Sequence, residues 1–252
     1  MNTNWTREET IIAFNVYCKI PFKDSSKNHP LIVGYANIIG RSPSALNMKI
    51  GNIGRLDPLL REKGIVGLSH GSKIEQLVWD EFYRNPEKLV YESECLIAKY
   101  SNGNVENTID IANLPGGKER IAIIKQRINQ SFFRTTVLAS YNNMCCISGI
   151  SNPRLVEACH ISGWAEDIRN RTNPHNGICL NPFFHQAYDK YYIAITSDFT
   201  IEISDALFDN TKEESSRLYF QAINKRKMYL PEKFLPDRDL LQAHYENYKK
   251  SK

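Results

Sequence analysis

Hydrophobic residues recur at helical spacing near the start of the chain. The apolar positions between 11 and 17 fall on one face of a helix, and Thr6 followed by Glu9 has the spacing of a capping box at the start of that helix. A second apolar face predicts a helix over 30–39. Gly40 is expected to end it, because glycine readily adopts the left-handed conformation found after helix ends.

A third helix is predicted over 43–56, with Ser42 as its N-cap and proline in its first turn. The short turn before it has the spacing of a helix-turn-helix. The segment WTREE at 5–9, ahead of three helices, resembles the opening of Myb-like DNA-binding domains. That resemblance implies that the third helix enters a DNA groove. Its candidate contacts with bases and phosphates are Ser44, Asn47, Lys49 and Arg55. The alternative is a small helical bundle with a solvated charged face.

The second half of the chain alternates short strand and helix patterns. The pattern predicts a helix over 132–141, a strand over 154–161, a strand over 177–180 and a helix over 182–188. A β-hairpin over 191–204 and a terminal helix over 237–250 follow. The fold class expected from these elements is α+β.

One loop-like stretch, rich in Asn and Gly, lies at 101–118. We therefore predict a helical DNA-binding domain over 1–100, a linker over 101–125 and a second domain over 126–252.

Composition narrows the class of protein. The 252 residues are 42% hydrophobic and 24% charged, which is typical of a globular chain and not of a disordered one. The sequence holds no apolar run of membrane-spanning length and no signal-peptide layout, so we expect a cytoplasmic protein without a membrane partner. The net charge is +4, and basic residues gather at 41–61, which fits an anionic partner.

The residues between 126 and 203 resemble the HNH endonuclease superfamily, which has a ββα-metal fold. The likeness is to the subgroup found in bacterial restriction-type HNH proteins. Five pieces of its pattern occur in order: F-R-x-x-V-L-x-x-Y from Phe133, C-x-x-[ST]-G ending at Gly149, E-A-x-H-I from Glu157, N-G-I-x-L from Asn176 and H-x-x-[FY]-D from His185. The resemblance implies a nuclease that hydrolyses phosphodiester bonds.

Phosphodiester hydrolysis explains why these residue types are present. An imidazole that titrates near neutral pH can take a proton from the attacking water, and we assign His160 this role. His185 and Asp189 are four apart on a helix, a spacing that lets both hold one divalent ion, expected to be Mg²⁺ or Mn²⁺. Asn176 is expected either to ligate the metal or to orient His160, and family members use it in both ways.

Cys159 departs from the family pattern, because many members carry Asp or His before the catalytic His. A thiolate suits Mg²⁺ poorly, so either Cys159 is a buried structural residue or the site takes a softer ion. We favour burial. The six cysteines form no C-x-x-C pair, and we expect no structural zinc.

The leading hypothesis is a restriction or defence endonuclease that recognises a short sequence or a modified base in double-stranded DNA. Basic residues flanking the motifs would hold phosphates: Arg154, Arg169, Arg171 and Lys190. A homodimer would suit double-strand cleavage. Two alternatives stay open: a non-catalytic DNA-binding protein that retains an HNH scaffold, and a partner-triggered HNH effector nuclease with little sequence preference.

Overall fold

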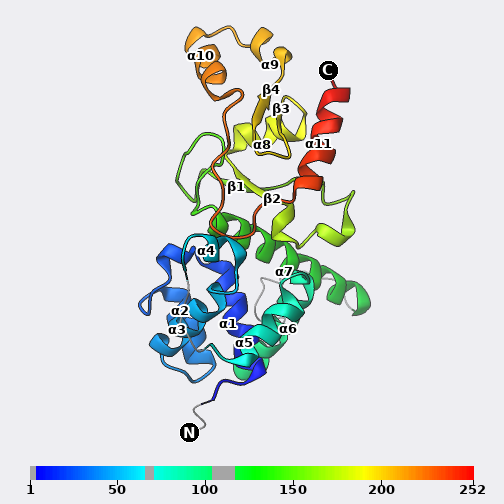
Figure 1. Ribbon diagram of the computed structural model, residues 1–252. Helices are drawn as coiled ribbons and strands as arrows, with labels where there is room; N and C mark the ends of the chain where they lie inside the picture. Colours follow the sequence, from blue (N-terminus) through cyan, green and yellow to red (C-terminus); the bar gives the residue numbers. More distant parts are fainter. Residues whose placement is uncertain (1–3, 66–70, 104–116) are drawn as a thin grey trace. The chain divides into compact units, whose positions relative to one another are not determined.

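The chain forms two compact units, Met1–Ser140 and Tyr141–Lys252 (Figure 1). The computed structural model describes residues 4–65, 71–103 and 117–252. The predicted linker, 101–125, precedes this division, and its residues 104–116 lie outside the described residues. Each unit is therefore considered by itself.

The described part of the first unit is helical. Its elements are α1 (Arg7–Lys19), the 3₁₀ turn η1 (Phe22–Asp24), α2 (Pro30–Ile38), α3 (Pro43–Gly54), α4 (Pro58–Glu62), α5 (Lys73–Phe82), α6 (Pro86–Tyr100) and α7 (Gly117–Ser140). The three predicted helices correspond to α1, α2 and α3, and their predicted ends agree to within one or two residues.

The predicted helix ends have the expected capping geometry. The Thr6 hydroxyl accepts a hydrogen bond from the Glu9 N–H, and the Thr6 N–H donates back to the Glu9 carboxylate. The Ser42 hydroxyl accepts from the Ala45 N–H. Gly40 has φ +67°, the left-handed conformation that ends α2. These local signals confirm the capping predictions.

A three-helix prediction for this unit is incomplete, because α1 is covered on nearly every side. Every residue from 9 to 18 is buried, and α1 packs against α2, α3, α5, α6 and α7. On one of these sides, Trp79 of α5 stacks on Phe14 with ring centroids 5.1 Å apart. A helix buried all round needs more than two neighbours.

Helix α7 begins much earlier than predicted. It starts at Gly117 rather than near residue 132, and it packs against α1 and α6 of the first unit. The predicted start of the second domain, at residue 126, therefore falls inside this helix. Its apolar side chains, such as Ile124, Ile128 and Phe132, are buried, which explains why the helix belongs to the first unit.

The second unit is built on a strand–strand–helix core. Strands β1 (Glu157–His160) and β2 (Gly177–Leu180) pair antiparallel, with Cys159 opposite Ile178 and His160 opposite Gly177, and α8 (Pro182–Asp189) packs against both. The observed strand β1 is therefore shorter than the strand predicted over 154–161. The remaining elements are η3 (Ile168–Asn170), η4 (Pro174–Asn176), β3 (Ile193–Ile195), β4 (Ile201–Ile203), α9 (Asp205–Asp209), α10 (Glu214–Ile223) and α11 (Arg238–Lys250).

Strands β3 and β4 form the predicted hairpin, and α11 is the predicted terminal helix. Helices with two small antiparallel sheets make this an α+β structure, as the sequence indicated. Helix α11 packs against β3, and its His244 ring stacks on Tyr188 of α8 with centroids 3.7 Å apart.

The buried His244 makes a pH-dependent contribution to stability. Burial lowers the pKa of its imidazole from 6.5 to about 4, because the interior disfavours the charged ring. Between these values the unfolded chain binds more protons than the folded one. The free energy of unfolding should therefore be unaffected above about pH 6.5 and should fall as the pH drops towards 4.

We expect this group to cost about 2 kcal/mol of stability at pH 5 relative to pH 7.5. His244→Phe keeps an aromatic ring on Tyr188 but cannot titrate, so its loss over the same interval should be smaller by that amount. Urea unfolding at both pH values, followed by circular dichroism, measures the difference. An identical pH dependence in the two proteins would contradict it.

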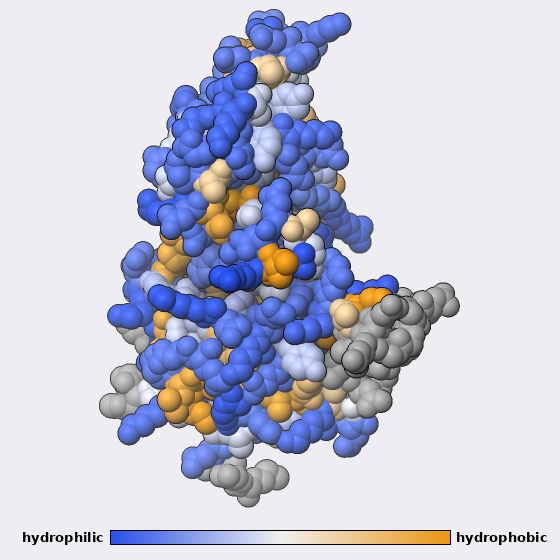
Figure 2. All heavy atoms as spheres, turned by 90° about the vertical axis from the view of Figure 1, so that its right-hand side faces the viewer, coloured by the Kyte–Doolittle hydropathy of each residue, from blue (hydrophilic) through white to orange (hydrophobic). Residues whose placement is uncertain are grey.

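No helix among the described residues is apolar over the length that a membrane crossing requires. On the face drawn in Figure 2, apolar side chains appear in small groups among hydrophilic ones.

Candidate active site

The residues with candidate chemistry in the second unit gather on β1 and α8. Helix α8 is capped by Asn181, whose side chain accepts from the Phe184 N–H, and its buried face carries Phe184 and Tyr188. The adjacent face presents His185 and Asp189, one turn apart as predicted. Their Nε2 and Oδ2 atoms lie 3.5 Å apart.

Glu157 on β1 holds the His185 ring. Its Oε2 lies 2.7 Å from His185 Nδ1. Because a carboxylate only accepts hydrogen bonds, Nδ1 carries the proton of this bond, and Nε2 is the ring nitrogen nearer Asp189. This is the carboxylate–histidine arrangement that orients metal-binding imidazoles. Glu157 and His185 are 28 residues apart, so no local spacing in the sequence points to this contact.

Cys159 is fully buried, as predicted, but its sulfur also faces the pair on α8. The Sγ lies 3.8 Å from Asp189 Oδ1. Burial, together with the Asp189 carboxylate, raises the pKa of the Cys159 thiol well above its usual range. Among the described residues, Cys159, His185 and Asp189 form the one group of three ligand-type side chains whose atoms lie within 4.8 Å of one another.

His160, the predicted base, ends β1. Its Nε2 lies 3.0 Å from the Arg171 carbonyl oxygen, and its ring meets Trp164 edge-on with centroids 5.6 Å apart. A carbonyl only accepts, so Nε2 donates and the neutral ring has its lone pair at Nδ1. Burial lowers the pKa of the His160 imidazole, which keeps it neutral and able to accept a proton.

Asn176 is fully buried and uses its amide within the protein. Its Oδ1 accepts from the Ser162 N–H at 2.8 Å, and its Nδ2 donates to the carbonyls of Ser162 and Asn170. These bonds fix the segment that follows His160. They support the orienting role and count against the metal-ligand role.

Arg171, predicted to contact phosphate, is engaged in the loop around His160. Its Nε donates to the Trp164 carbonyl, and its guanidinium lies 5.1 Å from the centre of the Trp164 ring. With its own carbonyl on His160, Arg171 is placed to position the His160 ring. Trp164 and this carbonyl were not anticipated from the sequence.

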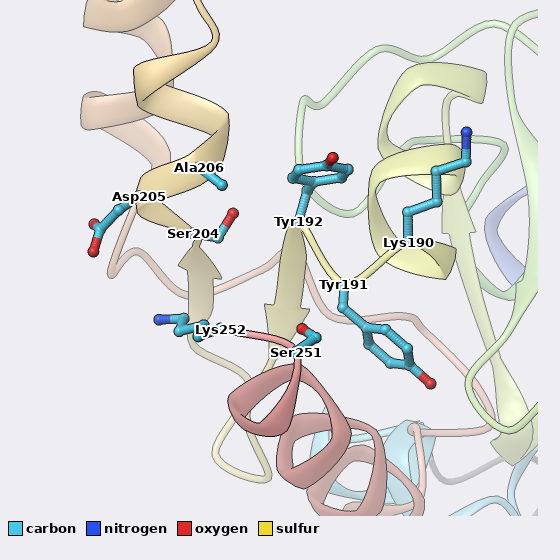
Figure 3. Close-up of a pocket in the computed structure, with 8 residues that line it drawn as sticks. All are labelled: Lys190, Tyr191, Tyr192, Ser204, Asp205, Ala206, Ser251 and Lys252. Carbon is cyan, nitrogen blue, oxygen red and sulfur yellow. The ribbon is translucent and has the colours of Figure 1, made fainter.

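The other basic residues predicted to flank the site are exposed. Arg154, Arg169 and Lys190 all have solvent-accessible side chains. Lys190 also lines a cavity of about 360 Å³ at the end of α8. Figure 3 shows Tyr191 and Tyr192 in this cavity with their rings pointing in opposite directions.

Two of the four contacts predicted on the third helix have their charges engaged within the first unit. Lys49 is 4% exposed, and its Nζ lies 2.6 Å from Glu75 Oε1. The Arg55 guanidinium lies 3.5 Å from the other Glu75 oxygen. Lys49 and Arg55 therefore share the single negative charge of Glu75, and the Lys49 side chain is buried, so in this structure it is not exposed to a phosphate.

The remaining two predicted contacts on α3 differ in availability. Asn47 is half-buried and accepts a hydrogen bond from the Ser25 hydroxyl, whereas Ser44 is exposed. Arg41 of the basic stretch is also paired, with both Glu9 oxygens. The positive charge that is concentrated along the sequence is therefore largely balanced in space.

Comparison with known proteins supports the predicted superfamily for the second unit. Residues 145–196 match the family model described as HNH endonuclease, and all the site residues on β1, β2 and α8 lie within this match. The match supports nuclease activity, a nucleic-acid substrate and a site of the kind that takes a divalent metal. No curated protein matches the chain.

Proposed function

We propose that this protein is a metal-dependent DNA endonuclease whose catalytic centre is the β1–β2–α8 core. One observation carries the proposal. His160, held by the Arg171 carbonyl, lies on the same small core as the His185–Asp189 pair, and this core falls within the segment that matches HNH endonucleases.

In the proposed reaction His160 is the general base. With Nε2 donating to the Arg171 carbonyl, the ring would receive the proton of the attacking water at Nδ1. Asn176 holds the segment after His160 in place through three hydrogen bonds. The half-buried ring would give up this proton readily afterwards, since its surroundings disfavour the charged form.

His185 and Asp189 fit a divalent ion, because an imidazole nitrogen and a carboxylate oxygen on one helix face are ordinary metal donors. When bound, such an ion supplies stabilisation of negative charge on the phosphate oxygens. Glu157 would keep the donor nitrogen of His185 directed at it. Arg154, Arg169 and Lys190, all exposed, would hold the DNA backbone.

The first unit is proposed to contribute to recognition of double-stranded DNA. Ser44, exposed at the start of α3, is the contact that remains from the helix-turn-helix hypothesis, and Asn47 and Arg55 would have to exchange their present partners. The biological role that we propose is bacterial restriction or defence in the cytoplasm, with a homodimer making double-strand cuts.

Substrate choice tests this role. Unmodified plasmid and plasmids carrying methylated or hydroxymethylated cytosine are incubated with the full chain and Mg²⁺ or Mn²⁺, and the cut ends are mapped. A restriction enzyme should give ends that share a short sequence or a modified base. Ends scattered at random over all plasmids would contradict the restriction role and favour a nonspecific effector nuclease.

A further inference from the structure

The α8 face of β1 brings a sulfur into the group of metal donors. Glu157 and Cys159 are two residues apart on the strand, so their side chains leave on the same side. Glu157 contacts His185 and Cys159 contacts Asp189, which shows that this side faces α8.

Three different donor atoms converge at this point. Cys159 Sγ is 3.8 Å from one Asp189 oxygen, and His185 Nε2 is 3.5 Å from the other. All three side chains offer atoms within 4.8 Å of one another. Small side-chain rotations would bring them to the separations that ligands of one ion have, since Zn–S, Zn–N and Zn–O bonds are roughly 2.0–2.3 Å.

This donor set does not suit Mg²⁺. Magnesium prefers six hard oxygen ligands, and one thiolate and one imidazole among three protein donors work against it. Zn²⁺ and Co²⁺ bind sulfur, nitrogen and oxygen together in four-coordinate sites. Three protein ligands with one open position are typical of catalytic zinc centres.

We propose that Cys159, His185 and Asp189 form a sulfur–nitrogen–oxygen centre that selects a borderline divalent ion, such as Zn²⁺, over Mg²⁺. Its use in DNA cleavage rests on the proposed nuclease function, whereas the binding itself does not. The buried thiol loses its proton to solvent when the ion binds. Cys159 is then a metal ligand as well as a buried residue of the sheet.

Cobalt provides a test that does not depend on activity. Co²⁺ is titrated into the reduced full-length protein, and the absorption spectrum is recorded. The wild-type protein should show the near-ultraviolet thiolate-to-cobalt charge-transfer band, and Zn²⁺ should remove it at near-stoichiometric amounts while millimolar Mg²⁺ should not. Cys159→Ser should lose the band.

Cys179→Ser is the matched control, because Cys179 is equally buried in the neighbouring strand and lies outside the donor group. It should keep the band. Outer-shell changes typically reduce metal affinity about 10–100-fold, so removing the sulfur ligand should weaken Zn²⁺ binding by roughly 100-fold or more. Should Cys159→Ser fail to fold, Asp189→Asn provides a second variant. Its side chain is 59% exposed, and it should keep the band with weaker cobalt affinity.

A wild-type spectrum without the band, or a band that survives in folded Cys159→Ser, would overturn the proposal. The nuclease assignment fails separately. Cleavage supported by Mg²⁺ or Mn²⁺ without a cobalt–thiolate band would leave the nuclease and remove this centre. A cobalt–thiolate band in a protein that cuts no DNA with any of these ions would support this metal centre and contradict the nuclease assignment.

Discussion

His160→Ala should lower the rate of DNA cleavage by about 10²–10⁴-fold, the usual contribution of a general base. The ring is the group that would take the proton from the attacking water, and alanine has no atom to replace Nδ1. DNA binding should persist, because the exposed basic side chains are elsewhere. Single-turnover cleavage of plasmid at saturating metal measures the rate, and gel-shift titration in EDTA measures binding.

His29→Asn is a suitable control for this variant. His29 belongs to the first unit, where its side chain accepts from the Leu31 N–H at the start of α2, and asparagine can replace that cap. This variant should cleave at the wild-type rate. A folded His160→Ala protein that also cleaved at the wild-type rate would remove His160 from the mechanism.

Lys49→Met should destabilise the first unit by about 3 kcal/mol, because removing one partner leaves the Glu75 carboxylate buried without its nearest cation. Glu75 is 1% exposed, so water cannot take over the role of Lys49. Arg55 at 3.5 Å compensates in part, which places the expected loss at the lower end of the range for broken buried pairs. Urea unfolding monitored by circular dichroism measures the change.

A double-variant cycle separates pairing from packing. Lys49→Met combined with Glu75→Gln should lose less stability than the sum of the two single variants, because the unpaired charge is then absent. Lys99→Met, which breaks an ion pair with Glu8 at the surface, should hardly shift the unfolding midpoint. A stable Lys49→Met protein with weakened DNA binding would instead restore Lys49 as a phosphate contact.

Features set by neighbouring residues could be predicted from the sequence. The capping box at Thr6, the stop at Gly40 and the one-turn spacing of His185 and Asp189 all depend on residues within four or so positions. The ordered motifs likewise located β1, β2 and α8, because each motif includes residues that its strand or helix requires.

Features set by distant partners could not be predicted. Lys49 and Glu75 are 26 residues apart, and Glu157 and His185 are 28 apart, so no local pattern joins them. The same applies to the Arg171 carbonyl that holds His160, since a backbone acceptor leaves no mark in the sequence. Charge density along the chain therefore suggested a DNA-binding helix whose cations are in part neutralised after folding.

For Cys159, one property could be predicted from the sequence and another could not. Its burial followed from residue type and strand position, whereas the direction of its sulfur depends on how α8 packs on β1. The two interpretations offered by the sequence, a buried residue or a ligand for a softer ion, are compatible in the folded protein.

The β1–β2–α8 core is proposed to cut DNA with the help of a divalent ion. Supercoiled plasmid is incubated with the wild-type protein and with His185→Ala/Asp189→Asn, in Mg²⁺, Mn²⁺, Zn²⁺ or Co²⁺, with EDTA as the blank. We predict nicked or linear plasmid with at least one ion, no cleavage in EDTA, and loss of cleavage in the folded double variant. Undiminished cleavage by the double variant would contradict this proposal. So would the absence of cleavage by the folded wild-type protein with any of these ions, on modified or unmodified plasmid.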